Sequence, residues 1–117
     1  CWVHYSGLNP VEYLKKYTGR APVVHLKDFH IEGKQEGDPY ALIGLNENET
    51  KKTSAFEFRP LGNGVQDIPA IIAAAKEAGS KWLVVEQDQP SMDKTPIECA
   101  ATSMEYLKSI GAVCCEE

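Results

Sequence analysis

The sequence predicts an α/β fold with a parallel sheet. Its main support is the order of elements, because short apolar runs of strand length alternate with amphipathic segments of helix length. Helices of about 10 to 15 residues between strands imply crossover connections, which join parallel strands. The composition agrees, since 43% hydrophobic and 25% charged residues over 117 positions are typical of a globular domain with one core.

The first part of the chain is predicted to contain two strands with a helix between them. Residues 1–5 (CWVHY) are apolar and aromatic, and we expect them to be the end of a strand whose beginning lies upstream. Asn9 is a suitable N-cap for a helix from Pro10 to about Tyr17, and Gly19 ends it. Residues 21–27 (APVVHLK) form the second predicted strand.

A long polar segment separates the second strand from the third. Residues 29–54 are rich in Gly, Glu, Asn, Lys and Thr and show no sustained periodicity, which predicts a long loop. Residues 55–59 alternate weakly between apolar and polar types and are expected to form the third strand. Two glycines in the following segment, PLGNG, favour a tight turn before the next helix.

The last part of the chain predicts a helix, a strand and a final helix. Asp67 is a good N-cap for a helix with one apolar stripe, and Gly79 ends this helix. Residues 81–86 (KWLVVE) form a fourth strand that is buried at its centre. The sequence TPIE, which begins at Thr95, is a capping box for the last helix, and we expect that helix to end at Gly111.

The charge and the cysteines exclude several classes of function. The net charge is -5 and the basic residues are scattered, so the chain has no basic face for nucleic acid or an anionic membrane. It has no run of about 18 apolar residues and no signal-like N-terminal pattern, so we expect a cytoplasmic protein without a membrane partner. The cysteines lack zinc-site spacing and are expected to be reduced thiols: Cys1, Cys99, Cys114 and Cys115.

Side chains that could carry chemistry lie at the C-terminal ends of three predicted strands. They are Trp2 and His4, then His25, Lys27 and Asp28, then Glu86 and Asp88. In α/β folds this edge binds ligands, because the following loops and helix N-termini converge there. A histidine and a carboxylate from separate strands suit a divalent ion, and no cysteine lies nearby to form a soft thiolate site.

Each of these residues also has a structural interpretation. His25 could be a core histidine bonded within its strand, and Lys27 with Asp28 could form an ordinary ion pair at the rim. Glu86 is harder to explain in this way, because a carboxylate after a buried strand is costly unless it is paired, metal-bound or solvated. The residues alone therefore leave both interpretations open, with Glu86 as the strongest candidate for function.

Four segments, taken together and in order, resemble one known family. The chain resembles the sugar phosphate isomerase/epimerase family, which has xylose isomerase-like TIM barrels, in WVHYSGLNPVEYLKKY, VVHLKD, EFRPLGNGVQDIPAIIAAAKEAG and WLVVEQD. This resemblance implies that residues 1–117 are the C-terminal half of a (β/α)8 barrel. Such a partial TIM barrel would hold about four β/α units, corresponding to strands five to eight, with residues 29–54 as a long loop insertion.

The resemblance also implies a metal-assisted reaction on a sugar or a sugar phosphate. Family members hold one divalent ion, often Mn, Mg, Co or Zn, with two glutamates, one aspartate and one histidine. His25 and Glu86 match two of these metal ligands, and the other two have no counterpart in this chain. Glu86 would also be the catalytic acid and base that moves the proton next to the sugar carbonyl through an enediolate. The expected substrate contacts are Trp2, His4, Lys27 and Asp28.

Two other classes of function compete with this interpretation. Half a ligand set is not expected to hold an ion strongly, so the chain could be a non-catalytic fragment that self-associates as a half-barrel homodimer. Metal-dependent endonucleases that act on abasic DNA share the barrel superfamily. The acidic net charge and the presence of only three histidines disfavour that class.

The chain alone is therefore predicted to be inactive. We expect no turnover of ketose or aldose substrates in an epimerase assay of the purified chain with added divalent metal, because half of the ligand set is missing. Robust substrate-dependent turnover would overturn this prediction. The molar mass from light scattering, with the metal content of the same sample, checks the fragment interpretation, which requires a dimer without bound metal.

Overall fold

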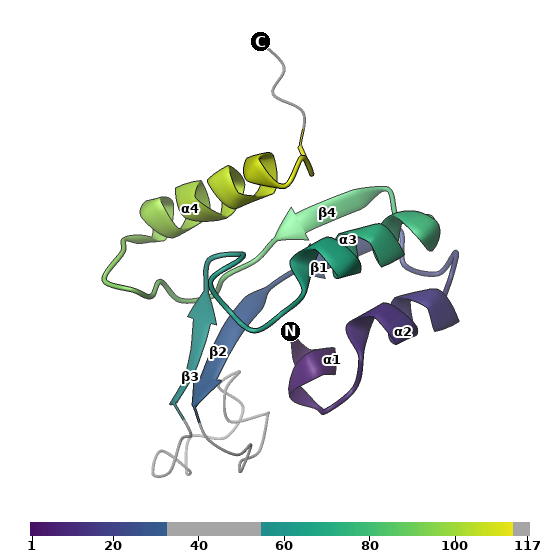
Figure 1. Cartoon of the computed structure of the whole chain (residues 1–117), viewed down its shortest axis with the longest axis horizontal. Coiled ribbons are helices and arrows are strands. Elements are labelled where there is room, and N and C mark those ends of the chain that lie inside the picture. Colours follow the sequence, from purple (N-terminus) through teal and green to yellow (C-terminus); the bar gives the residue numbers. More distant parts are fainter. Residues whose placement is uncertain (33–54, 114–117) are drawn as a thin grey trace.

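Four helices and four short strands make up residues 1–32 and 55–113, the part of the chain that this computed structural model describes (Figure 1). In chain order they are α1 (Trp2–Tyr5), α2 (Pro10–Lys16), β1 (Val23–Leu26), β2 (Asp28–Glu32), β3 (Ala55–Arg59), α3 (Ile68–Glu77), β4 (Trp82–Val85) and α4 (Pro96–Ser109). Within these residues, no helix has both the length and the apolar character needed to cross a bilayer.

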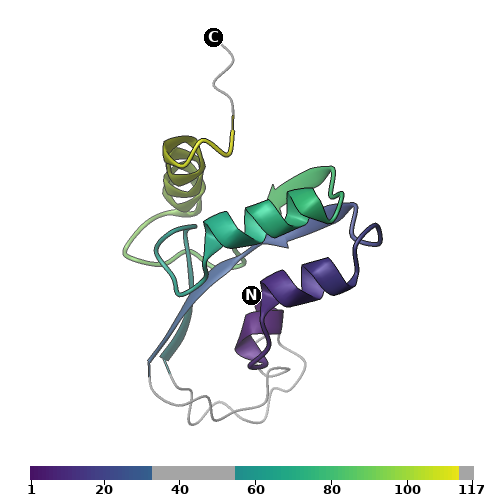
Figure 2. The ribbon, with the colours of Figure 1, turned by 45° about the vertical axis from the view of Figure 1, so that its right-hand side comes forward.

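The strands form two separate two-stranded sheets. β1 pairs in parallel with β4, with Val23 opposite Trp82 and Leu26 opposite Val85, and α3 lies between the two strands in sequence. This is one βαβ unit. β2 pairs antiparallel with β3, from Asp28 opposite Arg59 to Glu32 opposite Ala55. Only Lys27 separates β1 from β2, so one extended segment supplies a strand to both sheets (Figures 1 and 2).

The core lies on one face of the β1–β4 pair. Figures 1 and 2 show α2 and α3 side by side, and both lie along this face. α3 presents one apolar stripe to the sheet, as its sequence predicts. The buried apolar cluster consists of Leu26, Leu61, Ile68, Ile71, Ile72 and Leu107. α4 joins it through Leu107, and the Ser103 hydroxyl accepts a hydrogen bond from the Leu61 amide at 3.0 Å.

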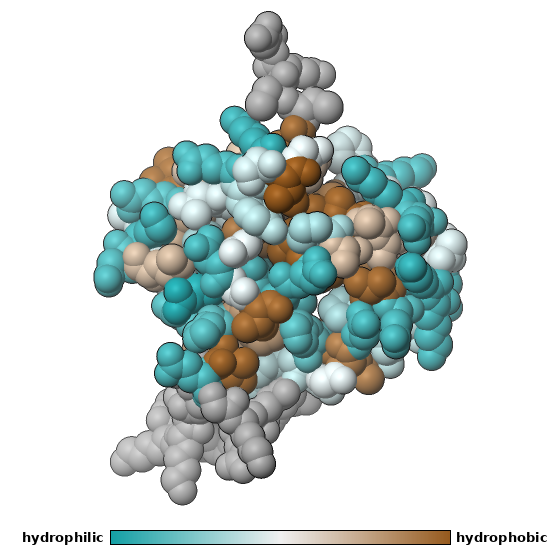
Figure 3. All heavy atoms as spheres, viewed as in Figure 1, coloured by the Kyte–Doolittle hydropathy of each residue, from teal (hydrophilic) through white to brown (hydrophobic). Residues whose placement is uncertain are grey.

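In the described part of the chain, no helix covers the other face of the β1–β4 pair (Figures 1 and 2). Three apolar side chains on it stay exposed, with 46% of Val23, 69% of Trp82 and 42% of Val84 accessible to solvent. Successive side chains of a strand point to opposite faces, so His25 and Glu86 share this open face with them. On the side of the molecule seen in Figure 3, apolar residues lie among hydrophilic ones.

Most predicted elements are confirmed, with bounds shifted by one or two residues. The helices α2, α3 and α4 have the expected N-caps, including the capping box at Thr95, where the side chains of Thr95 and Glu98 bond each other's backbone amides. The strands predicted at 21–27, 55–59 and 81–86 are β1, β3 and β4. The expected burial of the fourth strand at its centre is wrong, because Val84 is 42% exposed on a sheet face that no described helix covers. Cys1 and Cys99 are free thiols, whereas Cys114 and Cys115 lie outside the described residues.

The predicted first strand is wrong, because residues 2–5 form the helix α1. The amide of Tyr5 donates to the Cys1 carbonyl at 2.8 Å, and the amide of Ser6 donates to the Trp2 carbonyl at 3.0 Å. A short apolar run fits a helix turn as well as a strand, so its periodicity could not decide. The ring of Trp2 instead stacks on Phe56 at 5.9 Å between centroids.

The predicted loop and the predicted parallel order also need correction. Residues 29–32, expected at the start of the loop, belong to β2, and residues 33–54 lie outside the described part. β3 pairs antiparallel with β2, so the described residues hold two parallel strands instead of four. The cause is nonlocal, since the pairs Phe29 with Phe58 and Ile31 with Phe56 join segments far apart in sequence.

A buried carboxylate fixes the turn that leads from β3 into α3. Both oxygens of Asp28, which is fully buried, accept hydrogen bonds from backbone amides. Oδ1 accepts from Phe29 and Gln66, and Oδ2 accepts from Gly62 and Gly64, at 2.9 to 3.2 Å. A side chain at Gly64 would overlap the Asp28 carboxylate, so glycine is required there. Asp28 thereby holds the start of α3 against the end of β1.

Replacing Asp28 by Asn is expected to destabilise the fold. The amide group of D28N would turn two donors towards backbone N–H groups that now donate to an oxygen, and would leave those groups unsatisfied. We expect the free energy of unfolding to fall by about 2 to 4 kcal/mol, measured by urea denaturation. D93N, at an exposed left-handed position that asparagine tolerates, should change it little. A D28N protein as stable as D93N would contradict this role of Asp28.

Candidate functional site

The candidate site lies where the two parallel strands end. The backbone amide of Glu86 donates to the Leu26 carbonyl at 2.9 Å and continues the pairing one residue beyond β4. Four polar side chains gather at this edge, and we call them the Lys27 cluster: His25, Lys27, Glu86 and Asp88. The strand pairing therefore brings together residues 61 positions apart in the sequence.

The Glu86 carboxylate bridges the other members of the cluster. Its Oε2 lies 2.6 Å from His25 Nδ1, and its Oε1 accepts a hydrogen bond from Lys27 Nζ at 3.1 Å. Lys27 Nζ also donates to Asp88 Oδ2 at 2.6 Å. One lysine thus bonds two carboxylates, and one of those carboxylates also pairs with an imidazole.

Lys27 is the buried member of the cluster. Only 5% of its side chain is exposed, compared with 34% for Glu86 and 47% for Asp88. Its Nζ lies 4.6 Å from the ring centroid of Phe58 and 5.4 Å from that of Trp2, close enough for cation–π attraction. A buried ammonium without a partner would be costly, so the two carboxylates and the two rings together stabilise it.

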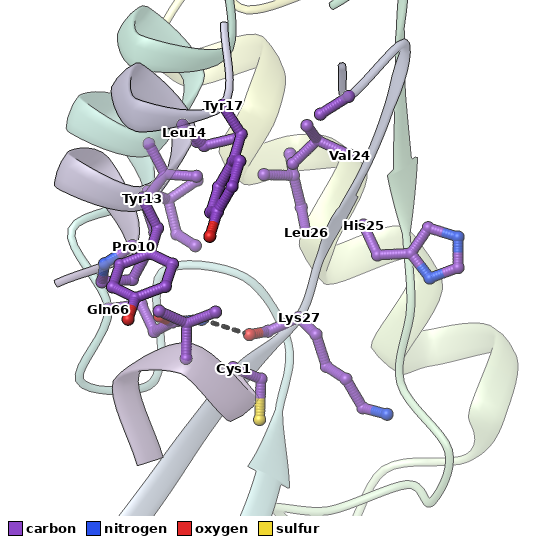
Figure 4. A pocket seen from close by; sticks show the side chains of 14 residues that line it. Cys1, Pro10, Tyr13, Leu14, Tyr17, Val24, His25, Leu26, Lys27 and Gln66 are labelled. Atoms are coloured by element: carbon purple, nitrogen blue, oxygen red, sulfur yellow. Dashed lines mark hydrogen bonds between the residues drawn. The ribbon is translucent and has the colours of Figure 1, made fainter. Parts of the chain in front are cut away.

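An apolar cavity lies beside the strand end, and its lining residues include His25 and Lys27. It has a volume of about 260 Å³ and lies between α2, β1 and α3. Figure 4 shows Tyr13, Leu14 and Tyr17 on the same side of β1 as this cavity. The side chains of His25 and Lys27 point towards the other side of the strand (Figure 4). The cluster accordingly belongs to the open face of the sheet.

The neighbours of Glu86 keep its carboxylate ionised. Burial raises the pKa of Glu86, but the hydrogen bonds and charges of Lys27 and His25 outweigh burial and hold the pKa below its ordinary value of 4.5. Glu86 is therefore an anion at neutral pH with both oxygens already engaged. An ionised carboxylate next to a histidine and a lysine can accept a proton or bind a cation.

The structure brings together three of the predicted site residues and places the others nearby in different roles. His25, Lys27 and Glu86 are in direct contact, and Trp2 lies over the Lys27 ammonium. His4 packs edge-on against Phe29, with 5.4 Å between ring centroids. Asp28 is committed to the turn before α3, as described above. The substrate contacts expected of Trp2, His4, Lys27 and Asp28 stay predictions.

The sequence analysis assigned no specific role to two residues at the site, Asp88 and Phe58. Asp88 was recognised as a polar residue after the fourth strand, and its position two residues beyond Glu86 was the available signal. Phe58 gave no signal, because its contact with Lys27 depends on the pairing of β3 with β2.

The cluster contains the kinds of ligand atom that bind divalent ions, but it does not contain enough of them for a complete metal site. An imidazole nitrogen from His25 and a carboxylate oxygen from Glu86 are common ligands of such ions. In residues 1–32 and 55–113, no group of three or more His, Cys, Asp or Glu side chains is arranged to hold a metal ion. The second oxygen of Glu86 is bonded to the Lys27 ammonium, which repels a cation.

This chain is similar to several proteins named inosose dehydratase. The chain is 32% identical over 114 residues to an inosose dehydratase of Clostridium botulinum (strain Eklund 17B / Type B), covering 93% of this chain and 35% of the relative. It is 31% identical over 108 residues to an inosose dehydratase of Clostridium beijerinckii, covering 89% and 34%. For an inosose dehydratase of Mesomycoplasma hyopneumoniae (strain J) the identity is 30% over 114 residues, covering 91% and 34%.

The similarity extends over nearly all of this chain but over a limited part of each relative. The chain spans about a third of the length of the curated relatives that it matches. No protein family model matches it. These matches relate the chain to one part of the proteins named inosose dehydratase.

The depressed pKa of Glu86 predicts a pH dependence of stability. Because this pKa is lower in the folded chain than its ordinary value of 4.5, ionised Glu86 stabilises the fold above about pH 4.5. That contribution is lost as the pH falls through the folded-state pKa. The free energy of unfolding of the wild type, from urea denaturation, should therefore drop more between about pH 6 and about pH 3 than that of E86Q.

An exposed glutamate provides the matched control for this measurement. E77Q removes the same charge from the exposed pair of Glu77 with Lys15, whose side chains are 66% and 57% accessible. Its stability should follow the wild-type pH profile. A pH profile of E86Q that matches the wild type would contradict the coupling of Glu86 to Lys27 and His25.

Proposed function

We propose that this chain forms part of a sugar-modifying enzyme in which Glu86 removes a proton next to the carbonyl of a polyhydroxylated ketone. The observation that carries the proposal is the bridging Glu86 carboxylate, held by His25 and Lys27 at the carboxyl end of two parallel strands. That edge is where ligands bind in α/β folds. The similarity to inosose dehydratases supports the proposal, since an inosose is a cyclic polyol that carries a ketone group.

The same first step serves the isomerase, epimerase and dehydratase reactions. Glu86 takes the proton from the carbon next to the carbonyl, and the electron pair moves to the carbonyl oxygen as an enediolate. Return of the proton gives an isomer or an epimer, whereas loss of a neighbouring hydroxyl group as water gives dehydration. The substrate class is therefore a small sugar, a sugar phosphate or an inosose, and the dehydratase relatives favour the last.

Each residue of the cluster and its surroundings has a separate role in this proposed reaction. His25 fixes one oxygen of Glu86 and Lys27 fixes the other, so the carboxylate is oriented before substrate arrives. His4 would offer a donor to the hydroxyl groups of a sugar. Lys27 is buried and bonded to two carboxylates, and the Trp2 ring stacks on Phe56 and covers that lysine, so both support the site and do not contact substrate directly. Asp28 is left out of this assignment, because four backbone amides already occupy its carboxylate.

A divalent ion such as Mn²⁺, Mg²⁺, Co²⁺ or Zn²⁺ is part of the proposal. His25 and Glu86 would supply two of its ligands, and further ligands would come from outside the cluster. When bound, such an ion supplies Lewis-acid stabilisation of the charge that develops on the carbonyl oxygen.

In this proposal the chain is a C-terminal part of a (β/α)8 barrel, and its described residues supply two of the barrel strands instead of the four expected from the sequence. β1 and β4 would be consecutive strands of that barrel, because they pair directly, and α2, α3 and α4 would lie outside it. The open face with Val23, Trp82 and Val84 would then face the barrel interior. The antiparallel pair of β2 and β3 would lie at the rim beside the cluster.

The open face also favours a second candidate, a non-catalytic fragment that self-associates. Trp82 is the most exposed apolar side chain of this face at 69%, and burying such a face against a second copy would remove it from water. In this case the chain would be a homodimer without enzyme activity, and the molar mass in solution distinguishes it from a monomer.

A chimera tests the proposed function. The matched segment of the Clostridium botulinum inosose dehydratase is replaced by this chain, and the dehydration of inosose is measured. We expect the chimera to be active, and E86Q in it to lower kcat by about 100-fold or more, as expected for loss of a general base. H25A should also lower activity, because the imidazole holds one oxygen of Glu86.

H30A is the matched control, since His30 lies outside the cluster and contacts Glu32 at 3.8 Å. Its chimera should keep the activity of the unmodified chimera. An active chimera that is indifferent to E86Q would contradict the role proposed for Glu86.

A further inference from the structure

The Lys27 ammonium lies between two carboxylates. Its nitrogen is 2.6 Å from Asp88 Oδ2 and 3.1 Å from Glu86 Oε1, so it sits between two carboxylates that both follow β4. An ammonium is a compact point charge that donates to such oxygens, and a divalent ion would bind the same oxygens at about 2.0 to 2.2 Å. The two cations would therefore compete for the same pair of carboxylates.

This position is built by several elements of the fold. Lys27 follows β1 directly, its side chain is 5% exposed, and the rings of Phe58 and Trp2 cover its ammonium. The carboxylates reach it from the chain that leaves β4. Such a lysine contrasts with Lys15, whose side chain is 57% exposed and pairs with one exposed glutamate, Glu77, at 3.4 Å.

We propose that Lys27 is a positioning residue that serves as the built-in cation of Glu86 and Asp88. It orients the Glu86 carboxylate through Oε1, so that Oε2 faces His25, and it lowers the affinity of this chain for divalent metal ions. The inference rests on the proposed function in one respect, the assignment of Glu86 as a cation-binding carboxylate.

Removing the ammonium frees two carboxylates to bind another cation. In K27M two carboxylates lose their cation and stay next to the imidazole of His25. The attraction of the cluster for a divalent ion rises, because one positive charge has been removed beside it. The flexible thioether of methionine can occupy the space between Phe58 and Trp2, where sulfur–aromatic contacts are favourable.

If Lys27 had a purely structural role, its removal would lower the affinity for metal ions instead of raising it. Loss of a structural contact loosens the cluster and weakens every interaction in it, including any metal binding. A gain of metal affinity on removal of Lys27 is therefore a result that a structural role does not produce.

Isothermal titration of the purified chain with Mn²⁺ tests the proposal. We expect K27M to bind Mn²⁺ at least about tenfold more tightly than the wild type. K15M is the matched control, because it removes the same charge from an exposed ion pair, and it should bind as the wild type does. Equal affinities of folded K27M and wild type would overturn the proposal, and so would an equal gain in K15M.

Two further measurements cover the case in which K27M does not fold, as judged by circular dichroism. K27Q keeps a polar group in the site, and it should show the same gain in Mn²⁺ affinity over the wild type. In the wild type, millimolar Mn²⁺ should displace the ammonium and speed the acetylation of Lys27 relative to Lys15, followed by mass spectrometry. Lys27 acetylation that is unchanged by Mn²⁺ contradicts the proposal.

Double variants separate this inference from the proposed function. The gain in Mn²⁺ affinity expected for K27M should be absent in the double variant K27M/E86Q. This result would locate the bound ion at the cluster. If K27M gains affinity but the chimera above is indifferent to E86Q, the proposed function fails and the role of Lys27 stands. If the chimera depends on Glu86 but K27M binds Mn²⁺ no better than wild type, the role of Lys27 fails alone.

Discussion

The parallel pairing of β1 with β4 is the constraint on which the rest of the structure depends. Its register sets His25 opposite Val84, and the amide of Glu86 continues the ladder to the Leu26 carbonyl. The cluster therefore forms as a consequence of backbone hydrogen bonds between segments that are distant in sequence. The same pairing gives the sheet two faces, one covered by α2 and α3 and one left open, and the exposed part of the cluster belongs to the open one.

A second constraint acts at the junction of the two sheets. Residues 23–32 run as one extended segment through both sheets, and Lys27 lies at the point where the partner strand changes. At this junction Asp28 holds the turn before α3, and the pairing of β3 with β2 brings Phe58 close to the Lys27 ammonium. Two adjacent charged residues thus have different roles. The carboxylate of Asp28 accepts hydrogen bonds from backbone amides, whereas the ammonium of Lys27 donates to two side-chain carboxylates.

The open sheet face and the incomplete set of metal donors have a common explanation in the proposed barrel. A barrel encloses the face that carries Val23, Trp82 and Val84, and it brings side chains from other strands to the same rim. The relatives are about three times as long as the segment matched by this chain, so they contain the length that such a barrel needs. Within the cluster itself, one ammonium is already bonded to both carboxylates.

The sequence by itself determined the local elements, because their signals lie within a few residues. Asn9, Asp67 and Thr95 marked the starts of three helices, and the apolar runs VVHL and WLVV marked the two parallel strands. It also indicated His25 and Glu86, since both stand at strand ends. Only the tertiary structure decided that residues 2–5 are helical, that β2 and β3 pair antiparallel, and that Asp28 faces backbone amides while Lys27 faces carboxylates. These outcomes depend on contacts across long stretches of sequence, which a local pattern does not contain.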